Sequence, residues 1–381
     1  MTKDELLKQR ELAHGLISIK PNFDINNREQ LSQIYTPEVS TICKEVEHHP
    51  SMLKTLTSVG NSIAVITDGT AVLGLGNIGT LAGYPIVEAK ALVYKDLAGV
   101  NAIPLCVDQI GYNELIKTIK NISSSFSGIH LEDIKAPECF YIEDELKKTL
   151  NIPVYHDDQH GTAIAVLGAL YNASKVVNKD FSKLKVLILG AGASGIATAK
   201  LLLKAGIEDI ILVDKNGALV SGDETLNDPQ KEMAKITNKE LKKGTLEEVI
   251  KGRDVFIGLS EENLVTKEMV ESMNEDPIIF ALANPTPEIK PEIAKEAGAR
   301  VIATGGPSYP NQINNILVFP GLFKGLLEAK ETDVTYGVMI AVSKKLASLV
   351  ENPTAEKIIP GVFDGDIVKS VSETVVKNIE K

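Results

Sequence analysis

Cysteine is scarce in this sequence of 381 residues: Cys43, Cys106 and Cys139 are odd in number, widely spaced and in no CxxC pair. A disulfide framework and a structural zinc site are therefore not expected. The sequence also lacks a signal peptide and any apolar run of about 18 residues, the length of a membrane-spanning helix. Basic charge is in deficit, because 51 acidic residues face 40 Lys and Arg and the formal net charge is −11. These absences argue against nucleic-acid and membrane partners and predict a cytoplasmic protein.

The rest of the composition is that of a globular protein, with 44% hydrophobic and 24% charged residues. A chain of this length suggests two or three domains. Its beginning has a polar, helical pattern. In "TPEVSTICKEV", Thr36 has the chemistry of an N-cap, Pro37 suits the first helical position and Glu38 suits the first turn. We therefore expect a helix to start at this point.

From residue 62, short β-rich runs alternate with helical stretches, which predicts parallel α/β sheets. The expected strands of a first unit are "SIAVITDG", "AVLGLG", "NAIPLCVD", "GIHLED" and "IPVYHDD". Those of a second unit are "KVLIL", "DIILVD", "DVFIGLS", "PIIFALANP" and "ARVIATG". We predict an α/β fold with a parallel α/β substrate and metal domain (residues 1–157) and a Rossmann-type NAD-binding domain (residues 158–315). C-terminal helices (residues 316–381) are expected to pack back on the first domain.

Two stretches match the G-x-G-x-x-G pattern of dinucleotide-binding turns. In one, Gly190, Gly192 and Gly195 follow an apolar strand and open a helix, and the next strand ends at Asp214. This βαβ context predicts a dinucleotide site, because the glycines let a pyrophosphate approach the helix and the acid can bind a ribose hydroxyl. In the other, "GLGNIG" at residues 74–79, Pro85 follows closely and no helix is expected at the last glycine. A loop near a small anionic ligand and a purely structural loop are both open there.

The stretch "PVYHDDQHGTAIA" places Asp157 and Asp158 where a strand gives way to a helix. Helix capping alone can explain such residues. Glu132 and Asp133, however, end the preceding strand, and consecutive parallel strands often lie side by side. Carboxylates gathered at one sheet edge repel each other without a cation, and oxygen ligands suit Mg²⁺ or Mn²⁺. For the flanking histidines, His156 and His160, hydrogen-bonding roles are favoured over metal ligation.

A nicotinamide cofactor and a divalent metal together suit the oxidative decarboxylation of a 2-hydroxy acid. Hydride transfer oxidises the hydroxyl carbon, and the metal holds the electrons that remain when CO₂ leaves. This chemistry also needs a base to remove the hydroxyl proton. The two predicted sites therefore point to a reaction class but to no single substrate.

The sequence resembles the short bacterial malic enzymes over nearly its full length. The matching segments, in order, are "IYTPEVS", "GLGNIGTLAGYPIVEAKALVYKDLAGV", "LEDIKAPECF", "PVYHDDQHGTAIA", "LGAGASGIA", "FALANPTPEI" and "PNQINNILVFPGLF". The resemblance implies that (S)-malate is oxidised and decarboxylated to pyruvate and CO₂, with reduction of NAD(P)⁺ and a requirement for Mn²⁺ or Mg²⁺. It also implies a homodimer, with Tyr35 near the subunit contact.

The resemblance further implies roles for single residues. Lys90 matches the base that removes the malate hydroxyl proton, and Tyr35 matches the acid that protonates the enolpyruvate carbon. Asp157 matches a carboxylate near that lysine. The metal ligands implied are Glu132, Asp133 and Asp158. The cofactor residues are Gly190, Ala191, Gly192, Ala193, Ser194, Gly195, Asp214 and Asn284, and the residues contacting malate are Asn284, Asn314 and Asn315.

Cofactor choice and activity leave alternatives. Asp214 favours NAD because it repels a 2′-phosphate, whereas Lys215 could reach that phosphate, so we predict that NAD is preferred and NADP tolerated. One alternative activity is a soluble, metal-dependent oxaloacetate decarboxylase of the same family, which needs no redox step. An alternative of another class is a non-catalytic regulator that binds NAD or a metabolite.

Overall fold

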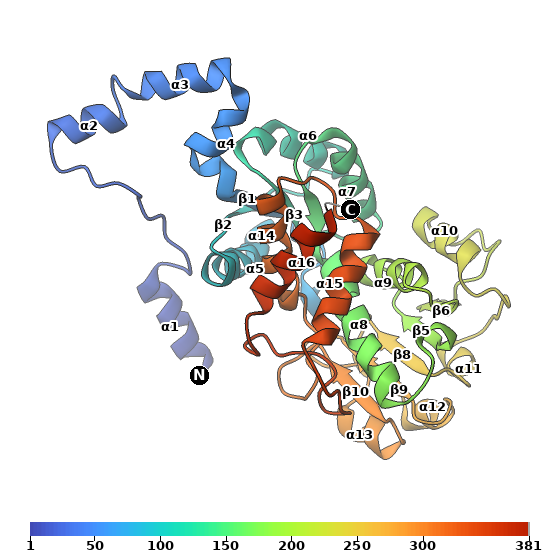
Figure 1. Cartoon of the computed structure of the whole chain (residues 1–381). Helices are drawn as coiled ribbons and strands as arrows, with labels where there is room; N and C mark the ends of the chain where they lie inside the picture. Colours follow the sequence, from blue (N-terminus) through green and yellow to red (C-terminus); the bar gives the residue numbers. More distant parts are fainter. Residues whose placement is uncertain (380–381) are drawn as a thin grey trace.

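Two sheets organise the chain, as the computed structural model in Figure 1 shows for the residues it describes, 1–379. The first sheet has the order β2-β1-β3-β4, and the second has the order β10-β9-β8-β5-β6-β7. All strand pairs are parallel except β6 with β7. The predicted parallel α/β architecture is therefore confirmed.

The first sheet is built from short strands separated by crossover helices. Its strands are β1 (Ser62–Thr67), β2 (Asn101–Cys106), β3 (Ile129–Leu131) and β4 (Val154–His156), and its helices are α5 (Thr80–Val93), α6 (Tyr112–Ile122) and α7 (Glu138–Thr149). The apolar strand β1 is buried along its whole length, as expected for a central strand of a parallel sheet. In the β3–β4 pair Leu131 lies opposite His156, so the residues that follow these two strands leave the sheet at the same edge.

The second sheet is likewise built from strands separated by helices. Its strands are β5 (Lys185–Leu189), β6 (Asp209–Asp214), β7 (Gly217–Ala218), β8 (Val255–Gly258), β9 (Ile278–Ala281) and β10 (Val301–Thr304). The helices between them are α9 (Ala193–Lys204), α10 (Asp228–Ile236), α11 (Leu246–Val249), α12 (Lys267–Glu271) and α13 (Pro291–Glu296). The strand–turn–helix–strand unit from β5 to β6 is the Rossmann unit that the sequence predicts.

The helix α8 (Asp157–Val176) connects the two sheets, and the C-terminal helices pack against it and against the first sheet. They are α14 (Phe319–Ala329), α15 (Tyr336–Ser348) and α16 (Ile367–Ile379). On α14, the rings of Phe319 and Phe323 lie 4.9 and 5.6 Å from the ring of Tyr94, between their centroids. The last part of the chain thus closes the core beside β3. Within residues 1–379, none of the helices combines the length and apolar character needed to cross a bilayer.

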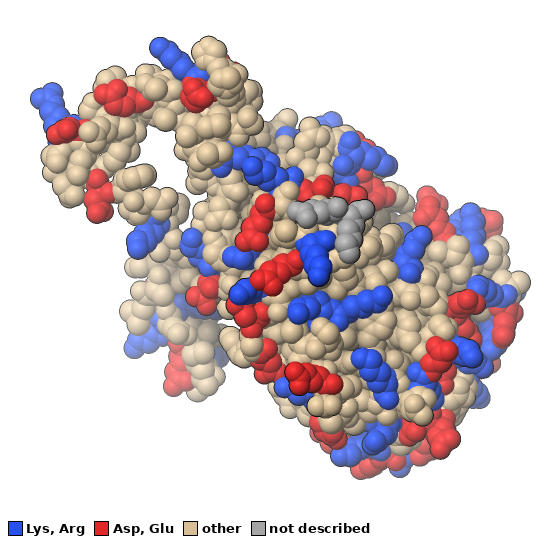
Figure 2. Space-filling model, viewed as in Figure 1, with Lys and Arg blue, Asp and Glu red and all other residues tan. Residues whose placement is uncertain are grey.

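The N-terminal arm (residues 1–57) projects from the body, as Figures 1 and 2 show. It carries α1 (Lys3–Ala13), α2 (Arg28–Ile34), α3 (Val39–His48) and α4 (Leu53–Leu56), and none of its residues is buried. The backbone N–H of Leu16 donates to Glu88 on α5, which ties the arm to the body at one point. On the face in Figure 2, blue and red side chains are interspersed over the body.

Three local expectations were wrong. The helix expected at Thr36 begins at Val39 instead, because Thr36 and Pro37 belong to a turn in which the Val39 N–H donates to the carbonyl of Tyr35. "AVLGLG" is not a strand but contains the 3-10 turn η3 (Leu73–Leu75). α5 does begin directly after Gly79 and contains Pro85, which costs the helix one backbone hydrogen bond but does not break it. The other 3-10 turns are η1 (Pro50–Met52), η2 (Ser58–Asn61), η5 (Ser123–Ser125), η6 (Phe181–Lys183) and η7 (Asn315–Leu317). η4 (Tyr94–Ala98) is a π-helical turn that continues α5.

Candidate active site

Four carboxylates meet at the edge of the first sheet where β3 and β4 end. Glu132 and Asp133 follow β3, and Asp157 and Asp158 form the first turn of α8. Glu132, Asp133 and Asp157 are buried, whereas the Asp158 side chain is 26% exposed. The Asp133 N–H donates to Asp158 Oδ2 at 2.8 Å, which joins the two chain segments. The residues that follow β3 and β4 thus meet at one edge of the sheet, as the sequence predicts.

Glu132, Asp133 and Asp158 fit a divalent cation. One carboxylate oxygen from each lies within 4.8 Å of the others, and the pKa of Asp158 is raised by burial and by the charge of Glu132. Such crowding is what a bound cation relieves, and an all-oxygen donor set suits Mg²⁺ or Mn²⁺. A second group, His130, Glu132 and Asp157, is equally close, but there the Lys90 ammonium already contacts both carboxylates.

Lys90 is brought to the carboxylates by α5. Its Nζ forms ion pairs with Asp157 and with Glu132 Oε2, the latter at 2.7 Å, and lies 4.7 Å from the centroid of the Phe319 ring. Burial lowers the pKa of this amine, but the charges of Asp157, Glu132 and Asp158 outweigh burial, so the pKa is raised above its ordinary value. The expected neighbourhood of Lys90 and Asp157 is thus present in the structure.

Two polar residues behind Glu132 were not anticipated. His130 Nε2 lies 2.7 Å from Glu132 Oε2, and its Nδ1 lies 2.8 Å from the hydroxyl of Tyr94. Both rings are fully buried. Burial and the nearby Lys90 charge lower the pKa of His130 to about 3. The available signal was a histidine inside an apolar strand and a tyrosine four residues after Lys90, but the sequence gives no partner for either.

Of the two flanking histidines, only His160 has the hydrogen-bonding role expected. Its Nε2 lies 2.8 and 2.9 Å from the two oxygens of Glu143, a buried carboxylate that also pairs with Lys147 at 2.8 Å. Neither ring nitrogen of His156 has a hydrogen-bond partner among the described residues, and its Nε2 lies 3.4 Å from Asp158 Oδ2. Glu143, on α7, was also missed by the sequence reasoning.

The glycine-rich turn has the geometry that its pattern predicts. A Cβ on Gly195 would lie 1.7 Å from the carbonyl oxygen of Gly190, so only glycine fits this turn. Gly192 caps α9, and Ser194 in its first turn donates from Oγ to the carbonyl of Asp158 at 2.8 Å. Asp214 ends β6 and accepts a hydrogen bond from the N–H of Asn216 at 2.8 Å. The turn is therefore bonded directly to the helix that carries two of the carboxylates.

One cavity of about 440 Å³ joins the two halves of the site. Its lining combines proposed metal ligands, the glycine-rich turn and the asparagines, namely Asp133, Asp158, Gly192, Ala193, Ser194, Asn284, Asn314 and Asn315. Lys135, which the sequence reasoning overlooked, adds a positive charge to this lining. Lys90 and Asp157 are not in the lining and lie buried beneath it. The cavity thus brings together residues that are far apart in the sequence.

Known proteins match both halves of this arrangement. Residues 17–114 match the family described as "Malic enzyme, N-terminal domain", and residues 159–381 match "Malic enzyme, NAD binding domain". The chain belongs to the malic enzyme family. It is 45% identical to the bifunctional malic/malolactic enzyme of Bacillus subtilis, over 98% of this chain and 92% of that protein. It is 46% identical to the NAD-dependent malic enzyme of Geobacillus stearothermophilus, over 95% and 76%.

A solved structure agrees with this membership. The NAD-dependent malic enzyme of Thermotoga maritima superposes with a TM-score of 0.94 at 40% identity, and the match covers 97% of this chain and 98% of that one. The expected family, the α/β fold and the class of NAD(P)-dependent malic enzymes are therefore confirmed. The alternative of a non-catalytic regulator is not supported by these matches.

In a malic enzyme, Tyr35 is expected to act beside Lys90, but one chain does not bring them together. Tyr35 follows α2 in the projecting arm, and it is 66% exposed. It is absent from the lining of the 440 Å³ cavity. Tyr35 therefore lies outside the body of its own chain.

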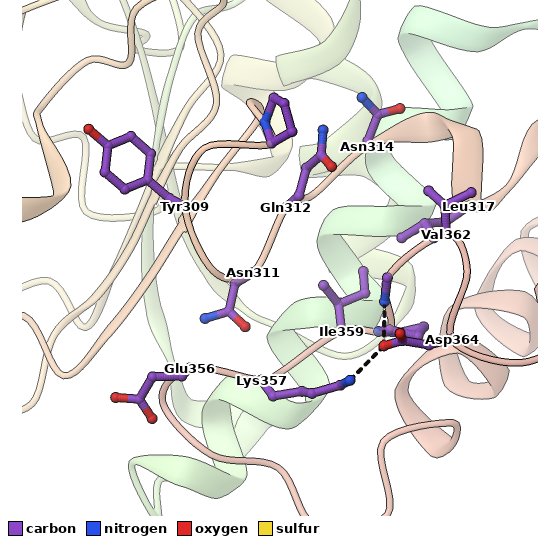
Figure 3. Close-up of a pocket in the computed structure, with 13 residues that line it drawn as sticks. Tyr309, Asn311, Gln312, Asn314, Leu317, Glu356, Lys357, Ile359, Val362 and Asp364 are labelled. Atoms are coloured by element: carbon purple, nitrogen blue, oxygen red, sulfur yellow. Dashed lines mark hydrogen bonds and ion pairs between the residues drawn. The ribbon is translucent and has the colours of Figure 1, made fainter.

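A second cavity, of about 290 Å³, adjoins the first through Asn314 and is drawn in Figure 3. Lys357 and Asp364 form an ion pair of 2.5 Å at its edge, and Tyr309 and Gln312 reach it from the loop after β10. Gln312 also donates to the carbonyl of Gly305, which helps to hold this loop behind the asparagines. The second cavity thus lies behind the loop that carries the asparagines.

Proposed function

We propose that the chain oxidises and decarboxylates (S)-malate to pyruvate and CO₂ while it reduces NAD(P)⁺, with Mg²⁺ or Mn²⁺ as the required cation. The observation that carries the proposal is the 440 Å³ cavity, whose lining unites two of the carboxylates, Asp133 and Asp158, with the glycine-rich turn and the asparagines. Hydride passes from the hydroxyl-bearing carbon of malate to the nicotinamide, and the hydroxyl proton goes to a base. Loss of CO₂ then leaves an enolate that takes up one proton to give pyruvate.

Glu132, Asp133 and Asp158 would hold the cation. When bound there, a divalent ion supplies Lewis acidity toward the oxygens of the substrate. Asn284, Asn314 and Asn315 donate or accept hydrogen bonds along the same wall, which orients malate against the nicotinamide. Among the described residues the lining holds Lys135, Asp133 and Asp158 but neither Lys90 nor Tyr35, so the proposed base and acid would have to act from beside the cavity and from a second copy of the chain.

Lys90 is the proposed base, and Asp157 holds it in place. The pKa of Lys90 is raised by nearby carboxylates, two of which, Glu132 and Asp158, are proposed metal ligands. Once their charges are countered, the neutral amine that a base requires becomes accessible. Asp157 is fully buried against Lys90 and can accept a hydrogen bond from this amine in either protonation state.

We infer that the working unit is a homodimer in which Tyr35 serves the site of the second copy. The arm exposes an unusual number of large apolar side chains for a segment without a core: Leu6, Leu7, Leu12, Ile19, Phe23, Ile25, Leu31, Ile34, Tyr35, Val39, Ile42 and Leu56. Exposed apolar surface of this extent marks an interaction site. On the body, Leu81 and Tyr84 are exposed on α5, the helix that carries Lys90, and offer a matching surface.

The expected cofactor preference depends on the charged residues at the end of β6. Asp214 lies where the ribose of the adenosine half would bind, and its charge disfavours a 2′-phosphate. Lys215 beside it can offset part of that repulsion. We therefore expect NAD to be preferred and NADP tolerated, and a catalytic efficiency at least tenfold higher with NADP⁺ would contradict this assignment.

The test is the absorbance of reduced nicotinamide in a mixture of protein, (S)-malate, Mn²⁺ and NAD⁺ or NADP⁺, with EDTA as the control. Metal-dependent formation of NAD(P)H with equimolar pyruvate supports the proposal. If no cofactor is reduced while oxaloacetate is consumed under the same conditions, the chain is instead the metal-dependent oxaloacetate decarboxylase of the family. The Asp158→Asn variant should lose both reactions.

A further inference from the structure

The imidazole of His130 lies in a place where an apolar residue would be expected. It belongs to β3, is fully buried and is surrounded by aromatic rings, with centroid distances of 5.6 Å to Tyr94, 5.8 Å to Phe319 and 6.0 Å to Phe323. Burying an imidazole costs free energy unless its nitrogens are hydrogen-bonded. Both nitrogens of His130 have partners, so the residue is integrated into a specific polar arrangement.

The direction of these hydrogen bonds follows from their partners. A neutral imidazole has one nitrogen that donates and one that accepts. Because a carboxylate oxygen accepts, the His130 Nε2–H donates to Glu132 Oε2 at 2.7 Å. The Nδ1 atom then accepts from the Tyr94 hydroxyl at 2.8 Å. Tyr94 thereby selects the one tautomer of His130 that can donate to Glu132.

Lys90 contacts Glu132, and Tyr94 contacts His130, from one continuous stretch of helix. Lys90 and Tyr94 are four positions apart, at the end of α5 and the start of η4, and so lie on one face. Lys90 Nζ reaches Glu132 Oε2 at 2.7 Å, and Tyr94 reaches His130. The contacts form a closed ring from α5 through Lys90, Glu132, β3, His130 and Tyr94 back to the helix. Glu132 Oε2 therefore has two donors, and Oε1 takes part in neither contact.

We propose that His130 is a positioning residue, oriented by Tyr94, which holds Glu132 so that Oε2 stays with Lys90 and Oε1 is presented to the divalent cation. This inference rests on the proposed metal site. Residues that hydrogen-bond to metal ligands orient them, and their loss typically weakens metal binding by about 10- to 100-fold. The ring of contacts also couples the metal ligand to the base, because a shift of Glu132 would displace Lys90.

Two substitutions at residue 130 separate the two hydrogen bonds. The amide of Gln reaches the position of Nε2, so His130→Gln can keep the donor to Glu132 and loses the contact with Tyr94. The shorter amide of Asn reaches the position of Nδ1, so His130→Asn can keep Tyr94 and loses Glu132. Tyr94→Phe removes only the hydroxyl that selects the tautomer. Phe323→Leu disturbs the same aromatic shell without touching the polar contacts, and it serves as the packing control.

The measurement is Mn²⁺ affinity, read from the electron paramagnetic resonance signal of free Mn²⁺ in a titration of the full chain. NADH affinity, read from nicotinamide fluorescence, reports whether each variant is folded. We expect His130→Asn to weaken Mn²⁺ binding by about tenfold or more. His130→Gln should remain within about threefold of the wild type, and Tyr94→Phe should fall between them. NADH affinity should change little, and Phe323→Leu should keep its Mn²⁺ affinity.

Three results would overturn the inference. The first is an unchanged Mn²⁺ affinity in His130→Asn. The second is an equal loss in His130→Asn and His130→Gln, which would assign the effect to packing. If His130→Asn does not fold, an unchanged affinity in Tyr94→Phe decides against the inference. Asp158→Asn distinguishes these failures from failure of the metal site itself, because a wrong site would leave Mn²⁺ binding unaffected by that variant too.

Discussion

The position of Tyr35 in the projecting arm leads to a prediction about mixed dimers. Tyr35→Phe removes the proposed acid, and Lys90→Ala removes the proposed base. Each variant alone should keep about 1% of the activity or less, since a positioned acid or base contributes roughly 10²- to 10⁴-fold. If Tyr35 acts on the second copy, a dimer with one chain of each kind contains one intact site, made from the Tyr35 of one chain and the Lys90 of the other.

The size of the recovery follows from this geometry. Random pairing of equal amounts of two chains in a two-fold symmetric dimer makes about half of the dimers mixed, and one of the two sites in each is intact. Co-expression of the two variants should therefore restore about a quarter of the wild-type activity per site. If Tyr35 acted within its own chain, every site would carry one lesion and no activity would return.

The assay is NADH formation from malate and Mn²⁺, first by the unsorted mixture and then by dimers that carry two different affinity tags and are purified through both. Every purified dimer is mixed and has one intact site of two, so the expected recovery rises from about a quarter to about half of the wild-type activity per site. A matched control pairs Lys90→Ala with Asp158→Asn. Both residues belong to the site of their own chain, so each site of a mixed dimer still carries one of the two changes. That control should stay inactive. Recovery near zero in the Tyr35 mixture, with mixed dimers present, would refute the placement of Tyr35 in the site of the second copy.

Three further predictions concern the metal, the cofactor turn and pH. Asp158→Asn should weaken Mn²⁺ binding about tenfold or more in a titration, and unchanged affinity would remove Asp158 from the ligand set. Gly195→Ala should lower the melting temperature, because its Cβ would lie 1.7 Å from a carbonyl oxygen. A Cβ at Gly192 meets nothing within 4 Å, so Gly192→Ala should keep its melting temperature while NADH binding weakens. Equal melting temperatures of the two variants would contradict this steric argument. Burial alone would raise the pKa of Glu143, but the nearby His160 and Lys147 outweigh burial, so the pKa of Glu143 is lowered. Burial also lowers the pKa of His160. For both groups the unfolded chain binds protons first, so the free energy of unfolding from urea titrations should fall as pH drops from about 6.5 to 4, and a flat profile would count against the buried pair.

The sequence was informative wherever a pattern has one local cause. The glycines before Gly195 and the acids after β3 and β4 could be assigned because strand ends in a parallel sheet share an edge. Local sequence patterns gave wrong or incomplete predictions where contacts with other segments determine the structure. Thr36 looks like an N-cap, yet the turn at Pro37 moves the helix start. His130 could not be interpreted without knowing that α5 presents Tyr94 and Lys90 on one face, and the arm gives no sign in sequence that it leaves the body.

The bond from Ser194 to the carbonyl of Asp158 has a mechanical consequence. Glu132 and Asp133 follow β3, and Asp158 follows β4 in the first turn of α8, the helix that leads to the second sheet. Of the three, Asp158 is the residue bonded to the dinucleotide turn. The proposed cation ligands thus lie beside the junction of the two halves, and a movement of the dinucleotide turn would be transmitted to Asp158 through this bond. A cation held by these three residues would connect the end of β3 with the start of α8. If dinucleotide binding shifts this turn and thereby changes the affinity for the cation, the cation must change the affinity for the dinucleotide by the same factor.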